Sequence, residues 1–134
     1  MYDSFIMKNF LLYIWQLPQN LVGLIVLAYC KLFLKNVSKE KYEDITYYYC
    51  KNFNGGISLG NYIISYSRNA LTIKHEHGHQ KQSLYLGPLY LFVIGIPSIC
   101  WAGLYGTKLF PYKENGYYEF YTERWAEQLG KVNR

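Results

Sequence analysis

The stretch Lys74-His75-Glu76-His77-Gly78-His79 contains all three histidines of the chain. Residues four positions apart share one face of an α-helix, so His75 and His79 on a helix can bind one metal ion together. Glu76 lies one step round the same helix, where its carboxylate can take a proton from a water that the metal activates. The stretch therefore predicts a helical site for Zn²⁺, with His75 and His79 as ligands and Glu76 as the catalytic base.

Two neighbours of these residues have other predicted roles. His77 lies roughly 200° round the helix from His75, so we expect it at the surface or behind the site, and not on the same metal. Gly78 leaves room for another backbone beside the metal. The alternative interpretation is a solvated helix that carries the H-E-x-x-H pattern by chance.

The third ligand must be a carboxylate or a cysteine, because no histidine remains. A helix is expected over residues 117–129, where Glu119, Glu123 and Glu127 are spaced four apart and share one face. Three acids on one face repel each other, and a bound dication would offset that repulsion. The alternative is a solvated acidic face paired with basic side chains.

His75-Glu76-x-x-His79 followed by Glu123-Arg124-Trp125-Ala126-Glu127 resembles the motifs of gluzincins, in particular membrane zinc endopeptidases of the HtpX and CAAX-prenyl-protease type. The resemblance covers only these two motifs. It implies a zincin-like core with Glu123 as the third ligand. Glu127 stands where that family has Asp, and the resemblance implies that it orients a ligating histidine. The segments 75–83, 86–90 and 123–127 also resemble those of small bacterial proteins.

Composition predicts one small domain in a partly apolar setting. The 134 residues are 51% hydrophobic and only 17% charged, against ~25% in ordinary soluble domains. The net charge of +5 is scattered, which disfavours nucleic acid and suits weak attraction to anionic lipid. The three cysteines, Cys30, Cys50 and Cys100, are too widely spaced to indicate a zinc ribbon or a disulfide framework.

Two apolar stretches predict contact with a membrane. Residues 5–34 fit either one long tilted helix kinked at Pro18 or two short helices that turn at residues 16–20 and dip into the bilayer. A buried core helix is the alternative. Residues 88–105 contain Pro97, and we expect a short helical hairpin, a re-entrant segment or an interfacial helix there.

The predicted ligands restrict the topology. Glu123 must meet His75 and His79 on one side of a membrane, so the segment between them crosses an even number of times or not at all. Lys31, Lys35, Lys39 and Lys41 follow the first apolar stretch, whereas only Lys8 precedes its main part. By the positive-inside tendency, this asymmetry places the site on the cytoplasmic side.

The rest of the chain predicts a single α+β domain over residues 1–134. Residues 35–44 are expected to be a charged linker. A β-hairpin or three-stranded meander is expected over residues 45–66, with turns at Asn54-Gly55-Gly56 and Gly60-Asn61. The metal helix is expected over residues 69–86, capped by Ser67 or Asn69 and ended by Gly87-Pro88.

The function predicted from these features is a membrane-bound zinc endopeptidase acting on peptide or protein substrates. A strand within residues 57–65 would pair with the substrate. Tyr117, Tyr118 or Tyr121 would donate a hydrogen bond to the oxyanion. The alternatives are a non-enzymatic membrane protein with a structural or vestigial zinc site and a zinc hydrolase that cleaves another kind of amide.

Overall fold

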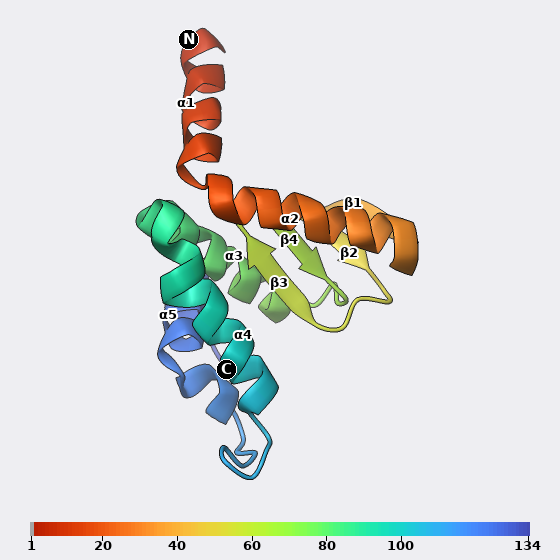
Figure 1. The fold of residues 1–134 in the computed structure, drawn as a ribbon, viewed down its shortest axis with the longest axis vertical. Coiled ribbons are helices and arrows are strands. Elements are labelled where there is room, and N and C mark those ends of the chain that lie inside the picture. Colours follow the sequence, from red (N-terminus) through yellow and green to blue (C-terminus); the bar gives the residue numbers. More distant parts are fainter. Residues whose placement is uncertain (1) are drawn as a thin grey trace.

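The computed structural model describes residues 2–134, with side chains from residue 7 onward. Its architecture is α+β, as the sequence predicts: five α-helices and short helical turns surround a four-stranded sheet (Figure 1). The helices are α1 (Tyr2–Trp15), α2 (Leu17–Tyr29), α3 (Ala70–Leu86), α4 (Ile96–Leu104) and α5 (Tyr121–Leu129). The strands are β1 (Val37–Tyr42), β2 (Ile45–Cys50), β3 (Gly56–Leu59) and β4 (Tyr62–Ser65). The π-helical turns are η1 (Cys30–Leu34) and η3 (Leu91–Gly95), and the 3-10 turns are η2 (Gly87–Leu89) and η4 (Gly116–Glu119).

The first apolar stretch forms two helices that meet at Gln16, which agrees with two short helices and not with one long helix; their insertion into a bilayer stays a prediction. The chain turns at Gln16 because the buried side-chain amides of Gln19 and Asn20 form hydrogen bonds with residues of other elements. Asn20 Oδ1 accepts from the backbone N–H of Asn61 at 2.7 Å, and Asn20 Nδ2 donates to the Tyr13 carbonyl at 3.0 Å. Gln19 Nε2 donates to Ser83 Oγ at 2.8 Å. This polar junction of Gln16, Gln19, Asn20, Asn61 and Ser83 fixes α2 to α3 and to the β3–β4 turn.

One helical run in the described part of the chain is long and apolar enough to cross a membrane. It comprises α2 and η1, Leu17–Leu34, and its mean hydropathy is 1.6. By length and composition alone this is weak evidence for a membrane protein, because helices packed inside soluble proteins pass the same test. The second apolar helix, Leu91–Leu104, is shorter.

The charged linker expected over residues 35–44 is wrong, because most of it is strand β1. β1 pairs antiparallel with β2, and Glu40 lies opposite Tyr47 in the register. The charges suit an edge strand, which has one open side and is protected from further pairing by charged side chains. Glu40 also accepts two hydrogen bonds of 2.7 Å from the Arg68 guanidinium, which ties β1 to the segment before α3.

The sheet is not a simple meander. Its order is β1-β2-β4-β3, with β2 and β4 parallel and the other pairs antiparallel. The hairpin of β3 and β4 around Gly60-Asn61 is as predicted. However, β4, and not β3, pairs with β2. This order leaves β3 as the second edge strand, on the side where the candidate site lies.

Two helices cover the two faces of the sheet. α2 crosses in front of the strands in Figure 1, and Leu27 and Cys30 pack there on Cys50 and Ile64. On the other face, Ile73 of α3 packs with strand residues Ile45, Tyr47 and Ile63. Both clusters are small, so the core serves mainly to hold α2 and α3 against the strands.

α3 has the predicted limits. Asn69 is its N-cap, and Asn69 Oδ1 accepts from the Leu71 N–H at 2.8 Å. The helix ends at Gly87, whose φ of 55° is in the left-handed region that favours glycine.

The two later helical segments differ from expectation. Of the alternatives for residues 88–105, the helical hairpin is wrong, because Leu91–Leu104 is one helical run; the interfacial helix stays a prediction. Pro97 lies in the first turn of α4, where a missing N–H is tolerated, directly after the π-helical turn η3. The last helix begins only at Tyr121, after extended backbone at Phe120. Glu119 therefore does not share a face with Glu123 and Glu127.

Gly78 allows α3 and α5 to touch through their backbones. A Cβ at Gly78 would lie 1.9 Å from the carbonyl oxygen of Ala126 in α5, a contact that no side chain can make. The space predicted beside the metal residues is thus occupied by the helix that carries Glu123 and Glu127.

We expect Gly78→Ala to lower the free energy of unfolding by at least ~1–3 kcal/mol, because the methyl group forces the two helices apart. The matched control is Gly103→Ala in α4, where a Cβ meets no atom within 4 Å. This control should be neutral or stabilising by up to ~1 kcal/mol through helix propensity. Denaturant unfolding of both variants measures the difference, and equal stabilities would contradict the role of Gly78.

Candidate metal centre

Helix α3 places both predicted histidine ligands on one buried face. His75 and His79 are one helical turn apart, and their rings meet edge to face at 4.8 Å. The Nδ1 atom of His75 is 2.8 Å from Glu127 Oε2, and that of His79 is 2.7 Å from Gln82 Oε1. Both Nδ1 atoms must carry a proton to donate to these oxygens. The two Nε2 atoms are thereby turned toward the same point and are the ring nitrogens available to a metal.

Glu123 of α5 supplies a carboxylate oxygen at that point. Its Oε1 lies 3.1 Å from His75 Nε2 and 3.3 Å from His79 Nε2. Its Oε2 accepts hydrogen bonds from Thr122 Oγ1 at 2.6 Å and from Ser98 Oγ at 2.8 Å. The two hydroxyl groups hold the carboxylate so that Oε1 faces the imidazoles.

Glu127 lies behind the site. It accepts from His75 on one oxygen and from the Arg134 guanidinium on the other. Arg134 also lies over the ring of Tyr118, with its Cζ 3.7 Å from the ring centroid, and Tyr118 packs edge to face on His75. These contacts fix the plane of the His75 ring from two sides.

The burial of these charges shifts their pKa values. Burial lowers the pKa of His75, but hydrogen bonds to Glu123 and Glu127 outweigh it and raise that pKa to about 10. Burial favours the neutral form of Glu123, yet the two histidines hold its pKa well below the usual range. Hydrogen bonds from His75 and Arg134 likewise lower the pKa of Glu127 against the effect of burial. Without a metal, the site is therefore an ion pair with a proton on His75.

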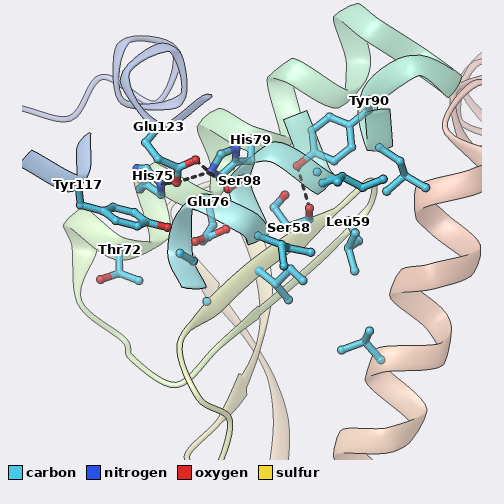
Figure 2. Close-up of a pocket in the computed structure, with 18 of the residues that line it drawn as sticks. Ser58, Leu59, Thr72, His75, Glu76, His79, Tyr90, Ser98, Tyr117 and Glu123 are labelled. Carbon is cyan, nitrogen blue, oxygen red and sulfur yellow. Dashed lines mark hydrogen bonds and ion pairs between the residues drawn. The ribbon is translucent and has the colours of Figure 1, made fainter. Parts of the chain in front are cut away.

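Glu76 lies beside the three converging side chains and is 6% exposed. Burial raises the pKa of its carboxyl group. Its carboxylate faces Gly56 of β3, where a Cβ would lie 2.9 Å from Oε1, so a side chain at position 56 would displace the carboxylate. Figure 2 shows Glu76 next to His75 and His79, at the wall of a cavity of about 560 Å³. A buried carboxyl group with a raised pKa has the properties of a general base.

The cavity connects the site to two apolar helices. Its polar end is formed by His75, Glu76, His79, Glu123 and Tyr117. Its other walls are largely apolar and come from β3, α2 and the η3–α4 helix. The candidate metal ligands therefore share one cavity with apolar side chains of β3, α2 and the η3–α4 helix.

The three predicted oxyanion donors have different positions. Tyr117 and Tyr118 both line the cavity, and Figure 2 shows the Tyr117 ring directed into it. Burial, followed by the charge of Glu123, raises the pKa of Tyr117, so its hydroxyl group keeps its proton. Tyr121 is turned away: it is 51% exposed and its hydroxyl donates to the Val93 carbonyl at 2.6 Å. The structure thus does not bring Tyr121 to the site.

Two further candidates, His77 and Glu119, lie outside the site. The Nδ1 atom of His77 is 3.0 Å from Gln80 Oε1, and His77 lines a separate polar hollow, as the helical angle predicts. Glu119 is exposed and lies 3.4 Å from Lys113 Nζ. This position leaves Glu123 as the carboxylate that meets the histidines.

Sequence reasoning missed the residues that position the ligands from neighbouring turns. Gln82 accepts from His79 and donates to the Thr122 carbonyl at 2.9 Å, so it links α3 to α5. Its spacing of three from His79 places it on the same helix face, and this spacing could have identified it. Ser98 lies in an apolar helix, and no pattern in the sequence links it to Glu123.

The donor set fits a metal ion. His75, His79 and Glu123 each offer one ligand atom, and these atoms lie within 4.8 Å of one another. In tetrahedral zinc with bonds of ~2.0–2.2 Å, neighbouring ligand atoms are roughly 3.3 Å apart. The separations of 3.1 and 3.3 Å between the imidazole nitrogens and Glu123 Oε1 agree with that spacing. Two imidazoles and one carboxylate also suit zinc chemically.

No family model, curated protein or solved structure matches this chain. Its function must therefore be inferred from the geometry and chemistry of the site.

We expect the metal-free protein to bind about one divalent zinc ion per chain. His75→Ala, His79→Ala and Glu123→Gln should each remove or strongly weaken binding, because each deletes a ligand atom. Glu127→Gln and Gln82→Leu should weaken it by roughly 10–100-fold, because they free a ligating ring to rotate. Zinc titrations with a competing chelator measure these affinities.

The controls are His77→Ala and Glu119→Gln, whose side chains lie outside the site. Both should bind zinc like the unaltered protein. Loss of the metal in Glu119→Gln, with binding kept in Glu123→Gln, would show that the ligand assignment on the last helix is wrong.

Zinc binding should release protons in a pH-dependent way. With a pKa of about 10, His75 is protonated at pH 8 in the metal-free protein and must lose a proton from Nε2 to bind a metal. Zinc affinity should then rise by roughly tenfold per pH unit from pH 7 toward pH 9, with about one proton released per ion. Calorimetry in buffers of different ionisation enthalpy measures this number. Zero proton release at pH 8 would contradict the protonated state of His75.

Proposed function

We propose that this chain is a membrane-associated, zinc-dependent peptidase with a zincin-like site. His75, His79 and Glu123 would hold the metal, and Glu76 would act as the general base. The observation that carries the proposal is the convergence of two Nε2 atoms and one carboxylate oxygen beside a separate buried carboxylate, at the end of an open cavity. When bound, zinc supplies Lewis-acid activation of a water molecule and of the scissile carbonyl group.

Glu76 suits the transfer of a proton in both directions. Its raised pKa lets it accept a proton from water and later deliver the proton to the amine that leaves. Glu123 does not suit this task, because its two oxygens already face the histidines and the two hydroxyl groups. The two carboxylates thus have environments that push their pKa values apart, which separates the roles of ligand and base.

Edge strand β3 offers a place for an extended substrate. Gly56 and Ser58 belong to this strand, line the cavity and lie beside the metal residues. An added strand would pair with the edge of β3 at Gly56, since the Ser58 carbonyl already accepts from the Tyr90 hydroxyl group at 2.9 Å. The Ser58 hydroxyl group is buried and makes no hydrogen bond to the described residues. Tyr117 is the better oxyanion donor, since its hydroxyl group remains protonated and faces the cavity.

The apolar walls of the cavity favour substrates with large apolar side chains near the cleaved bond. Ile57 and Leu59 of β3 and Ile96 of α4 form part of these walls. The basic residues Lys35, Lys39 and Lys41 that follow α2 favour the anionic cytoplasmic leaflet, which would place the catalytic end on the cytoplasmic side.

A structural zinc site is the competing function. Such sites are normally closed by four protein ligands, whereas His75, His79 and Glu123 supply three ligand atoms beside a cavity. A structural site also has no need for a buried base. The effect of substituting Glu76 therefore distinguishes the peptidase from the structural zinc site.

Glu76→Gln should keep zinc but lower peptide cleavage by roughly 10²–10⁴-fold, because it removes only the group that transfers the proton. The assay is cleavage of a quenched fluorescent peptide with apolar residues around the bond, followed at equal zinc occupancy. Glu119→Gln is the matched control and should cleave normally. Full activity in Glu76→Gln would exclude its role as base, and no cleavage by any zinc-loaded form would favour the structural site.

A further inference from the structure

The outer face of α2 and η1 is apolar along its whole length. Ile25 is 69% exposed and Phe33 is 71% exposed, although both are large apolar residues. They belong to a stripe with helical spacing that comprises Leu21, Leu24, Ile25, Tyr29, Leu32 and Phe33. Lys31 is the one charged residue of Leu17–Leu34, and its Nζ lies 5.8 Å from the ring centroid of Tyr48, back toward the sheet. This face has the composition of a surface that contacts lipid.

The helical run Leu91–Leu104 has a similar outer face. Phe92, Ile96 and Ile99 are more than half exposed, and no charged residue occurs between Leu89 and Thr107. Ile96, Ile99 and Val22 of α2 also line the cavity of the candidate site. The cavity is therefore lined in part by two helices whose exposed sides are both apolar.

The sheet prevents α2 from crossing a membrane as an ordinary span. β4 runs along α2, because Tyr62 lies against Gly23 and Ile64 packs with Leu27 and Cys30. β1 belongs to the same sheet, and its open edge carries the charged residues Lys39, Glu40 and Lys41. If α2 crossed the bilayer, these charges and the unpaired backbone of an edge strand would lie at the depth of the lipid chains. Irregular or unpaired backbone exposed to lipid is not tolerated there.

We propose that the protein binds a single leaflet, with α2–η1 and the η3–α4 helix lying in the plane of the membrane interface. The sheet-facing side of α2 then stays in protein while its outer face enters the lipid. The net charge of +5 favours an anionic leaflet, and Trp15 and Tyr29 suit the interface. The part of the cavity lined by Val22 and Ile99 then lies next to this leaflet. If the proposed peptidase function holds, apolar substrate segments enter from the lipid.

Flotation with vesicles of phosphatidylcholine and phosphatidylglycerol tests the docking face without any activity assay. Ile25→Glu and Phe92→Glu should each lower the partition coefficient by roughly 10- to 150-fold, because a large apolar side chain loses its place in lipid. Leu71→Glu on α3 is the matched control, since α3 covers the opposite face of the sheet, and it should bind like the parent protein. Equal binding by all three variants, or a stable dimer that masks these faces and does not bind vesicles, would overturn the proposal.

Labelling of single cysteines tests whether α2 crosses the bilayer. Asp44 shares a hollow with Gln16 at the start of α2, whereas Lys51 precedes Asn52, whose side chain donates to the Leu34 carbonyl at the end of η1. Asp44→Cys and Lys51→Cys, each in a Cys100→Ser background, are treated with an impermeant maleimide in right-side-out and in inside-out vesicles. We expect both cysteines to react in the same type of vesicle. Reaction in opposite preparations would show that α2 crosses the membrane and would overturn one-leaflet binding, whatever the outcome for zinc or peptide cleavage.

Discussion

The close contact between α3 and α5 is the constraint on which the candidate site depends. Gly78 lets the backbone of Ala126 approach, and this brings Glu123 within hydrogen-bond distance of both imidazoles. Three polar contacts hold the two helices in register around it: Lys81 Nζ to the Leu129 carbonyl, Gln82 to the Thr122 carbonyl, and His75 to Glu127. A side chain at position 78 would separate the carboxylate from the histidines before it affected any ligand directly.

The same contact buries the negative charge of Glu123 inside the protein. A carboxylate as buried as Glu123 is costly unless a positive charge and hydrogen bonds compensate it. In the metal-free chain this compensation comes from a protonated His75 and from the hydroxyl groups of Ser98 and Thr122. A dication could take the place of this proton while the Nδ1 atoms stay bound to Glu127 and Gln82. The buried group of His75, His79 and Glu123 could thus hold a metal ion.

The sequence predicts local elements well where their signals are local. The cap at Asn69, the end of α3 at Gly87 and the shared face of His75 and His79 all follow from short-range patterns. The α+β class follows as well. By contrast, the charged composition of β1 leads to the prediction of a linker. Such a composition is compatible with a strand only at the edge of a sheet, and the position of β1 at the edge depends on the order of the whole sheet. The predicted place of Glu119 on the last helix is wrong because spacing alone cannot reveal the extended backbone at Phe120.

Positioning residues are hard to predict because their partners are distant in the chain. Ser98 reaches Glu123 across 25 positions, from a helix whose composition suggests only apolar contacts. The amides Gln16, Gln19 and Asn20 interrupt an apolar stretch and indicate a turn, but their partners in α3 and the β3–β4 turn become visible only in the fold.

The polar junction also connects the site to the exposed apolar faces of α2 and α4, which we propose bind lipid. It anchors the start of α2 to the end of α3 through Gln19 and Ser83, so α2 cannot leave the sheet without breaking buried hydrogen bonds. The buried clusters on the sheet are small, whereas many large apolar side chains of α2 and α4 remain exposed within residues 7–134. Lipid contact on these exposed faces would supply apolar burial that the small core lacks. Because Val22, Ile96 and Ile99 belong both to those faces and to the cavity wall, lipid binding and the shape of the cavity should be coupled.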